Sequence, residues 1–185
     1  IRSFYPGHYD WDGKDMPLSA FNPTEFDPYE WTETAKKAGA KYVILTTKHH
    51  DGFALWPSAY TEYGVKNTPW EGGKGDVVKE YVDAARKSGL KVGLYYSPAQ
   101  WGDSAVKFEN DEEYDEYFLN QITELLTNYG KIDYLWFDGC GSENHEYDKE
   151  RIVNEIFRLQ PDILTFCPAQ WRPSVRWVGN EDGYA

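Results

Sequence analysis

One stretch decides the fold class: residues Asp76–Ser97, which read DVVKEYVDAARKSGLKVGLYYS. Apolar residues at helical spacing predict an amphipathic helix over Asp76–Ser88. Gly89 stands where a helix ends in the left-handed conformation, and Lys91–Ser97 is a short apolar run typical of a buried strand. The stretch is therefore a helix followed directly by a strand.

The same alternation repeats along the chain. Further helices are expected from Asp27 and Pro28 to Gly39, over Glu112–Tyr129 and over Lys149–Leu159. Further strands are expected at Lys41–Thr47, Ile132–Asp138, Ile163–Phe166 and Val175–Val178. Apolar strands that alternate with helices indicate an α/β fold with a parallel sheet, either an open doubly wound sheet or a (β/α)8 barrel.

The chain length bears on the choice between these folds. A (β/α)8 barrel normally needs about 250 residues, whereas this chain has 185 residues and about five predicted strands. Either part of a barrel is missing from the chain, or the sheet is open.

Composition excludes several classes of partner. There are 19 Lys and Arg residues against 31 Asp and Glu residues, a net charge of −12, which opposes binding to nucleic acid or to an anionic membrane. Two cysteines, Cys140 and Cys167, are too few for a disulfide scaffold. Aromatic residues make up 17% of the chain, which suits either a core of large side chains or a site for the flat faces of sugar rings.

Carboxylates follow two of the predicted strands. Asp138 ends the apolar run that begins at Tyr134, so it stands at the mouth of a dry core, as a nucleophile would. Glu181 follows the predicted strand at Val175–Val178, but Asp182 beside it is equally placed by the sequence alone. Two carboxylates on neighbouring strand ends, about 5–5.5 Å apart, are what retaining glycoside hydrolysis requires.

Two histidines directly extend the strand at Lys41–Thr47. Because neighbouring strand residues point to opposite faces, only one of His49 and His50 would face a site unless the chain turns there. They suit hydrogen bonds to neutral sugar hydroxyls. A divalent metal held by His49 and Asp51 is the alternative, but the sequence has no HExxH motif and offers no clear third ligand.

Several sequence motifs, and their order along the chain, closely resemble those of the family 29 glycoside hydrolases, which are retaining exo-α-L-fucosidases. The most specific are the segments KHHDGF, WFDG and VRWVGNE, at Lys48–Phe53, Trp136–Gly139 and Val175–Glu181. The likeness runs from about Phe21 to the end of the chain. Nothing before Phe21 matches the Phe-x-x-His-Trp stretch of the family's first barrel strand, and the family continues through its final strands after Glu181. The resemblance therefore implies a single catalytic-barrel domain over residues 1–185 that is incomplete, a fragment lacking the first and last barrel strands.

The resemblance implies roles for individual residues. It implies Asp138 as the nucleophile, and Glu181 as the acid/base of the subgroup that removes α-1,3/1,4-linked fucose. It implies that the side chains contacting the sugar are His49, His50, Trp56, Tyr96 and Trp136, with Tyr96 chosen over Tyr95. It implies no metal and no cofactor, a fucosylated oligosaccharide or glycoconjugate as substrate, and a secreted or periplasmic location.

Two other hypotheses stay open at this point. In the first, the chain is an inactive or sugar-binding fragment of a barrel. An unclosed barrel has two exposed strand edges, which favour a homo-oligomer. A metal-assisted hydrolase using His49 and Asp51 is the other hypothesis, and it predicts loss of activity with chelators.

Overall fold

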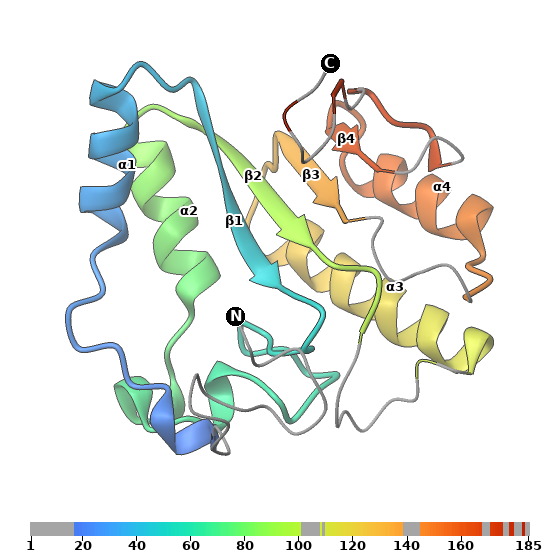
Figure 1. The fold of residues 1–185 in the computed structure, drawn as a ribbon, viewed down its shortest axis with the longest axis horizontal. Coiled ribbons are helices and arrows are strands. Elements are labelled where there is room, and N and C mark those ends of the chain that lie inside the picture. The colour runs from blue at the N-terminus through green and yellow to red at the C-terminus, as the bar shows by residue number, and fades with distance from the viewer. Residues whose placement is uncertain are drawn as a thin grey trace.

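A computed structural model describes residues 17–100, 108, 110–138, 145–167, 171–175, 178–179 and 183. Within them, four parallel strands form one sheet in the order β1-β2-β3-β4, and Figure 1 shows the first three side by side in chain order. The elements are α1 (Pro28–Lys37), β1 (Tyr42–Lys48), α2 (Val77–Lys87), β2 (Lys91–Tyr96), α3 (Asp111–Asn128), β3 (Tyr134–Phe137), α4 (Lys149–Leu159) and β4 (Leu164–Phe166), with single 3₁₀ turns at Leu18–Ala20, Val65–Asn67 and Trp70–Gly73.

The strand order separates the two folds that the sequence left open. A doubly wound sheet reverses its strand order at a switch point, whereas a barrel adds each new strand beside the last one. Each strand here pairs with the next along the chain. The α/β class and the incomplete (β/α)8 barrel are therefore confirmed.

Local sequence signals set the ends of the helices. The Asp27 carboxylate accepts hydrogen bonds from the backbone N–H groups of Tyr29 and Glu30 at the start of α1, and Asp76 accepts one from Lys79 at the start of α2. After α2, Gly89 takes a φ of +74°, which only glycine adopts without strain. These caps are why the predicted helix ends agree with the observed ones to within about one residue.

The two faces of the sheet differ in what covers them. Leu94 and Tyr96 of β2 and Phe137 of β3 are buried against the helices, and the Phe118 ring of α3 lies 5.2 Å from the Tyr96 ring. We call the opposite side the open face. It carries the side chains of Tyr42, Tyr95, Tyr134, Trp136, Leu164 and Phe166.

A β-bulge interrupts the alternation of side chains in β1. Thr46 pairs with Tyr95 and Lys48 pairs with Tyr96, so two residues of β1 oppose a single step of β2. The Thr47 hydroxyl donates to the Tyr95 carbonyl at the bulge. As a result Lys48 points to the helix side of the sheet, where strict alternation would have placed it on the open face.

A buried polar network holds the chain that follows β3. His145 contacts Asp115 of α3 through Nε2 at 3.1 Å and the Phe108 carbonyl through Nδ1 at 2.9 Å. The Asp115 carboxylate also accepts a hydrogen bond from the Asp148 backbone N–H. The segment leading into α4 is therefore fixed to α3.

The predicted strand at Val175–Val178 is not observed at residues 175 and 178, and residues 176–177 lie outside the described residues. None of the helices in the described part of the chain combines the length and apolar content that a membrane crossing requires.

Candidate functional site

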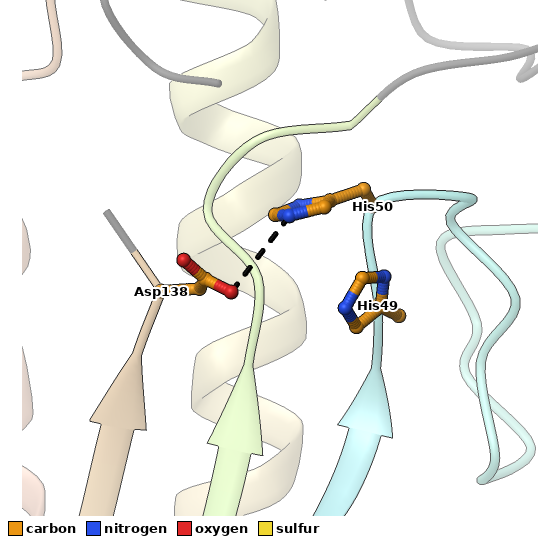
Figure 2. A group of neighbouring side chains, drawn as sticks. All are labelled: His49, His50 and Asp138. Atoms are coloured by element: carbon orange, nitrogen blue, oxygen red, sulfur yellow. Dashed lines mark ion pairs between the residues drawn. The ribbon is translucent and has the colours of Figure 1, made fainter. Parts of the chain in front are cut away.

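The carboxyl ends of β1 and β3 bring three predicted site residues together. His49 and His50 follow β1, Asp138 follows β3, and one ligand atom from each lies within 4.8 Å of the others. Figure 2 shows the His50 ring directed at the Asp138 carboxylate, with Nε2 3.7 Å from Oδ2. Both residues reach across β2, which lies between the two strands.

A turn lets both histidines approach the same carboxylate. The Gly52 N–H donates to the His49 carbonyl at 3.0 Å, which closes a four-residue turn directly after β1. Gly52 takes a φ of +82°, and a Cβ there would meet the Gln100 side chain at 2.8 Å. The chain therefore turns directly after β1, as it must if both histidines are to face one site. The two imidazole rings lie 4.3 Å apart.

Tyr95 of β2 completes the cluster. Its hydroxyl donates to Asp138 Oδ2 at 2.7 Å, and its ring stacks on the His49 ring, with centroids 5.7 Å apart and planes 6° from parallel. A hydrogen bond from a phenol fixes the direction of the carboxylate.

Burial sets the charge state of the histidines. Desolvation lowers the pKa of both His49 and His50 below the usual value, more strongly than the Asp138 carboxylate raises it. Both imidazoles are therefore neutral at pH 7, so each has one N–H donor and one acceptor nitrogen. Such a pair suits the recognition of uncharged hydroxyl groups.

Trp136 lies on the open face of β3, two residues before Asp138 and in register with Tyr95. Its ring is partly exposed and packs on the Phe166 ring of β4 with centroids 4.4 Å apart. Trp136 therefore offers an aromatic surface on the same side of the sheet as the carboxylate.

Two predicted contact residues lie elsewhere. Tyr96 is fully buried on the helix side of the sheet, and its hydroxyl donates to Gln121 of α3 at 2.7 Å. Trp56 is 1% exposed, and its indole N–H donates to Glu124 of α3 at 2.9 Å. Both predictions are corrected as to position: the two side chains belong to the packing between sheet and helices, and it is Tyr95 that lies against Asp138.

The remaining candidates are not part of the observed cluster. Glu181 lies outside the described residues, as does its neighbour Asp182. Asp51 is buried, and its carboxylate accepts a hydrogen bond from the Phe53 N–H at 3.3 Å. Asp138, rather than Asp51, is the carboxylate grouped with His49 among the described residues.

Sequence reasoning missed Ser97, whose hydroxyl lies within hydrogen-bond distance of His50 Nδ1. It also chose Tyr96 over Tyr95 as the residue that contacts the sugar. The period-2 pattern of β2 held the signal for Tyr95: Val92, Leu94 and Tyr96 share one apolar face, so Tyr95 belongs to the other.

Comparisons with known proteins point to one family. The alpha-L-fucosidase family model matches residues 2–170. Alpha-L-fucosidase 1 of Arabidopsis thaliana is 46% identical over 176 residues, which cover 94% of this chain and 34% of the relative. The chain thus spans about a third of the length of that relative.

Solved structures show the same likeness. A glycoside hydrolase 29 family member from an unknown rumen bacterium superposes with a TM-score of 0.80 at 42% identity, covering 90% of this chain and 32% of the other. An alpha-L-fucosidase from Lactobacillus casei in complex with alpha-L-fucose gives a TM-score of 0.64 at 31% identity, over 80% and 53% of the two chains. With the family match and the shared fold, the chain belongs to the alpha-L-fucosidase family.

Proposed function

We propose that the protein is a retaining, exo-acting alpha-L-fucosidase that removes terminal α-1,3/1,4-linked fucose from glycans. The observation that carries the proposal is the Asp138 carboxylate, oriented by Tyr95 and flanked by His50 at the carboxyl end of the sheet. Active sites of α/β barrels gather at this end. The Lactobacillus casei neighbour binds alpha-L-fucose, which supports the choice of sugar.

The chemistry is a double displacement. An Asp138 oxygen bonds to the anomeric carbon while the bond to the leaving oxygen breaks and Glu181 gives that oxygen a proton. Water then attacks the same carbon, Glu181 takes a proton from the water, and the bond to Asp138 breaks. Two inversions at one carbon leave the released fucose in the α configuration.

The side chains around Asp138 fit this sugar. Neutral His49 and His50 carry polar ring nitrogens, which suit hydrogen bonds to the hydroxyl groups of an uncharged sugar. The exposed part of Trp136 suits the C–H face and the methyl group of a deoxyhexose.

The test is hydrolysis of an aryl α-L-fucoside by the full-length protein, followed by proton NMR. The α anomer of fucose should accumulate first, before mutarotation, and early β anomer would overturn the retaining mechanism. Lewis-type trisaccharides with α-1,3 or α-1,4 fucose should be cleaved faster than an α-1,2-linked fucosyl lactose. The reverse preference would overturn the linkage.

Tyrosines 95 and 96 provide a matched pair of variants. Tyr95→Phe removes the hydrogen bond to Asp138, and a bond to a charged group contributes about 1.5–3 kcal/mol, so kcat/KM should fall about 10- to 100-fold. Tyr96→Phe removes only the buried bond to Gln121, so stability to urea should fall by about 1 kcal/mol with kcat/KM nearly unchanged. The opposite pattern would return Tyr96 to the sugar site.

A metal-assisted hydrolase is the second candidate, because two imidazoles and one carboxylate lie within 4.8 Å of one another. The residues concerned are His49, His50 and Asp138 rather than His49 and Asp51. Dialysis against EDTA separates the two candidates: a double displacement keeps its rate, whereas metal chemistry loses it and regains it on addition of Zn²⁺.

A further inference from the structure

Lys48, the last residue of β1, has its whole side chain buried. The bulge turns it to the helix side of the sheet, where its exposed fraction is 0%. Its ammonium donates to Gln100 Oε1 at 3.0 Å and to the Tyr114 hydroxyl at 3.3 Å, and it lies 4.4 Å from the centre of the Tyr96 ring. A lysine is thus built into the layer directly behind the two histidines.

Burying this side chain costs the folded state free energy of desolvation. Desolvation lowers the pKa of Lys48 to about 7, even though the nearby Asp51 carboxylate acts in the opposite direction. An apolar side chain of similar length, such as methionine, would fill the same space without the desolvation cost. Packing alone therefore does not account for a lysine here, and its hydrogen-bond partners indicate what it does.

Those partners hold one short segment, residues 97–100, which follows β2 and is buried throughout. Lys48 holds its end through Gln100. The Tyr114 hydroxyl, which accepts from Lys48, donates in turn to the Pro98 carbonyl. Lys48 is therefore bonded to this segment directly and through one tyrosine.

The segment decides which nitrogen of His50 carries the proton. The Ser97 hydroxyl donates its only hydrogen to the Ala99 carbonyl at 2.7 Å, since a carbonyl can only accept. Its oxygen must then accept the hydrogen bond that it shares with His50 Nδ1. A neutral His50 thus has its hydrogen on Nδ1, and Nε2 becomes an acceptor 3.7 Å from Asp138 Oδ2.

We propose that Lys48 is a positioning residue: it holds residues 97–100 so that Ser97 fixes His50 in the Nδ1–H tautomer, with Nε2 as the acceptor for a sugar hydroxyl beside Asp138. The inference rests on the proposed fucosidase function for its consequence in catalysis. The tautomer itself can be measured without any activity.

The test is Lys48→Met in the full-length protein. Nitrogen-15 NMR of the imidazole rings reports the tautomer, with the His50 signals assigned by their loss in His50→Gln. Wild type should show Nδ1–H at His50, and Lys48→Met should show a mixture of tautomers. Because a misplaced group near the reacting atoms can lower rates about 100-fold, kcat/KM for an aryl fucoside should fall by about that factor.

Lys87→Met is the matched control. The Lys87 ammonium also lies 4.4 Å from a tyrosine ring, that of Tyr29, but at the surface and on helices rather than behind the site. This variant should keep the His50 tautomer and the wild-type rate. If Lys48→Met does not fold, Gln100→Leu removes the same hydrogen bond from the other partner and should give the same two changes.

The outcomes are distinct. An unchanged His50 tautomer in a folded Lys48→Met or Gln100→Leu variant overturns the inference, and so does an unchanged kcat/KM. A wild-type protein that shows the Nδ1–H tautomer but cleaves no fucoside overturns the proposed function instead.

Discussion

Replacing Asp138 with glycine is expected to lower the hydrolysis of an aryl α-L-fucoside by at least about 10³-fold, because it removes the carboxylate on which the proposed covalent intermediate forms. Sodium azide should restore part of the turnover. The azide occupies the space of the missing carboxylate and attacks the anomeric carbon from that side as the aryl oxide leaves. The product should be β-fucosyl azide, identified by NMR and mass spectrometry.

The control for this variant lies at the other end of the same strand. Asp133 directly precedes β3, and its Oδ2 accepts a hydrogen bond from the Val92 N–H at 3.0 Å. Asp133→Asn keeps an acceptor oxygen there and removes a charge, so its activity should stay near the wild-type value. A rate for Asp138→Gly within tenfold of wild type, with no azide adduct, would end the assignment of the nucleophile.

Replacing Glu181 with alanine should lower the hydrolysis of a fucosylated glycan by about 10²- to 10⁴-fold, the usual contribution of general acid catalysis. A sugar alkoxide is a poor leaving group that needs a proton. An aryl fucoside with an acidic phenol needs little help in departing, so its first step should be slowed much less. The measurement is the ratio of the two kcat/KM values in wild type and variant.

Asp182→Ala is the matched control for Glu181. The two acids are adjacent in a glycine-rich segment, and the sequence by itself does not distinguish them. Asp182→Ala should leave the ratio of the two substrates unchanged. If it is the Asp182 variant that loses glycan hydrolysis selectively, the acid/base role moves to that residue.

The elements of the fold could be predicted because their signals are local. Asp27 and Asp76 cap helices through bonds to residues two or three positions away, and Gly89 ends a helix by its own backbone conformation. The strand order could not be chosen from such signals. It depends on pairing between segments at least 30 residues apart, such as Leu45 with Leu94 and Leu135 with Thr165.

The candidate site was predictable in part for the same reason. Asp138 and the two histidines each follow an apolar strand, and parallel strands bring such ends together. Trp56 was misplaced because its burial depends on Glu124, 68 residues further along the chain. The choice of Tyr96 failed because two identical side chains stand next to each other. The alternation of β2 places Tyr96 with Leu94 on the helix side, and the register with β3 places Tyr95 opposite Trp136, on the side of Asp138.

The bulge in β1 decides which side chains reach the carboxyl end of the open face. Without it, the residues after Thr46 would alternate strictly: the ammonium of Lys48 would enter the sugar site, and the His49 ring would enter the layer of tyrosines. Deleting Thr47, the extra residue, would instead leave Lys48 opposite Tyr96, where it already lies. One irregular step in a strand is therefore enough to choose between a cation and an imidazole beside Asp138.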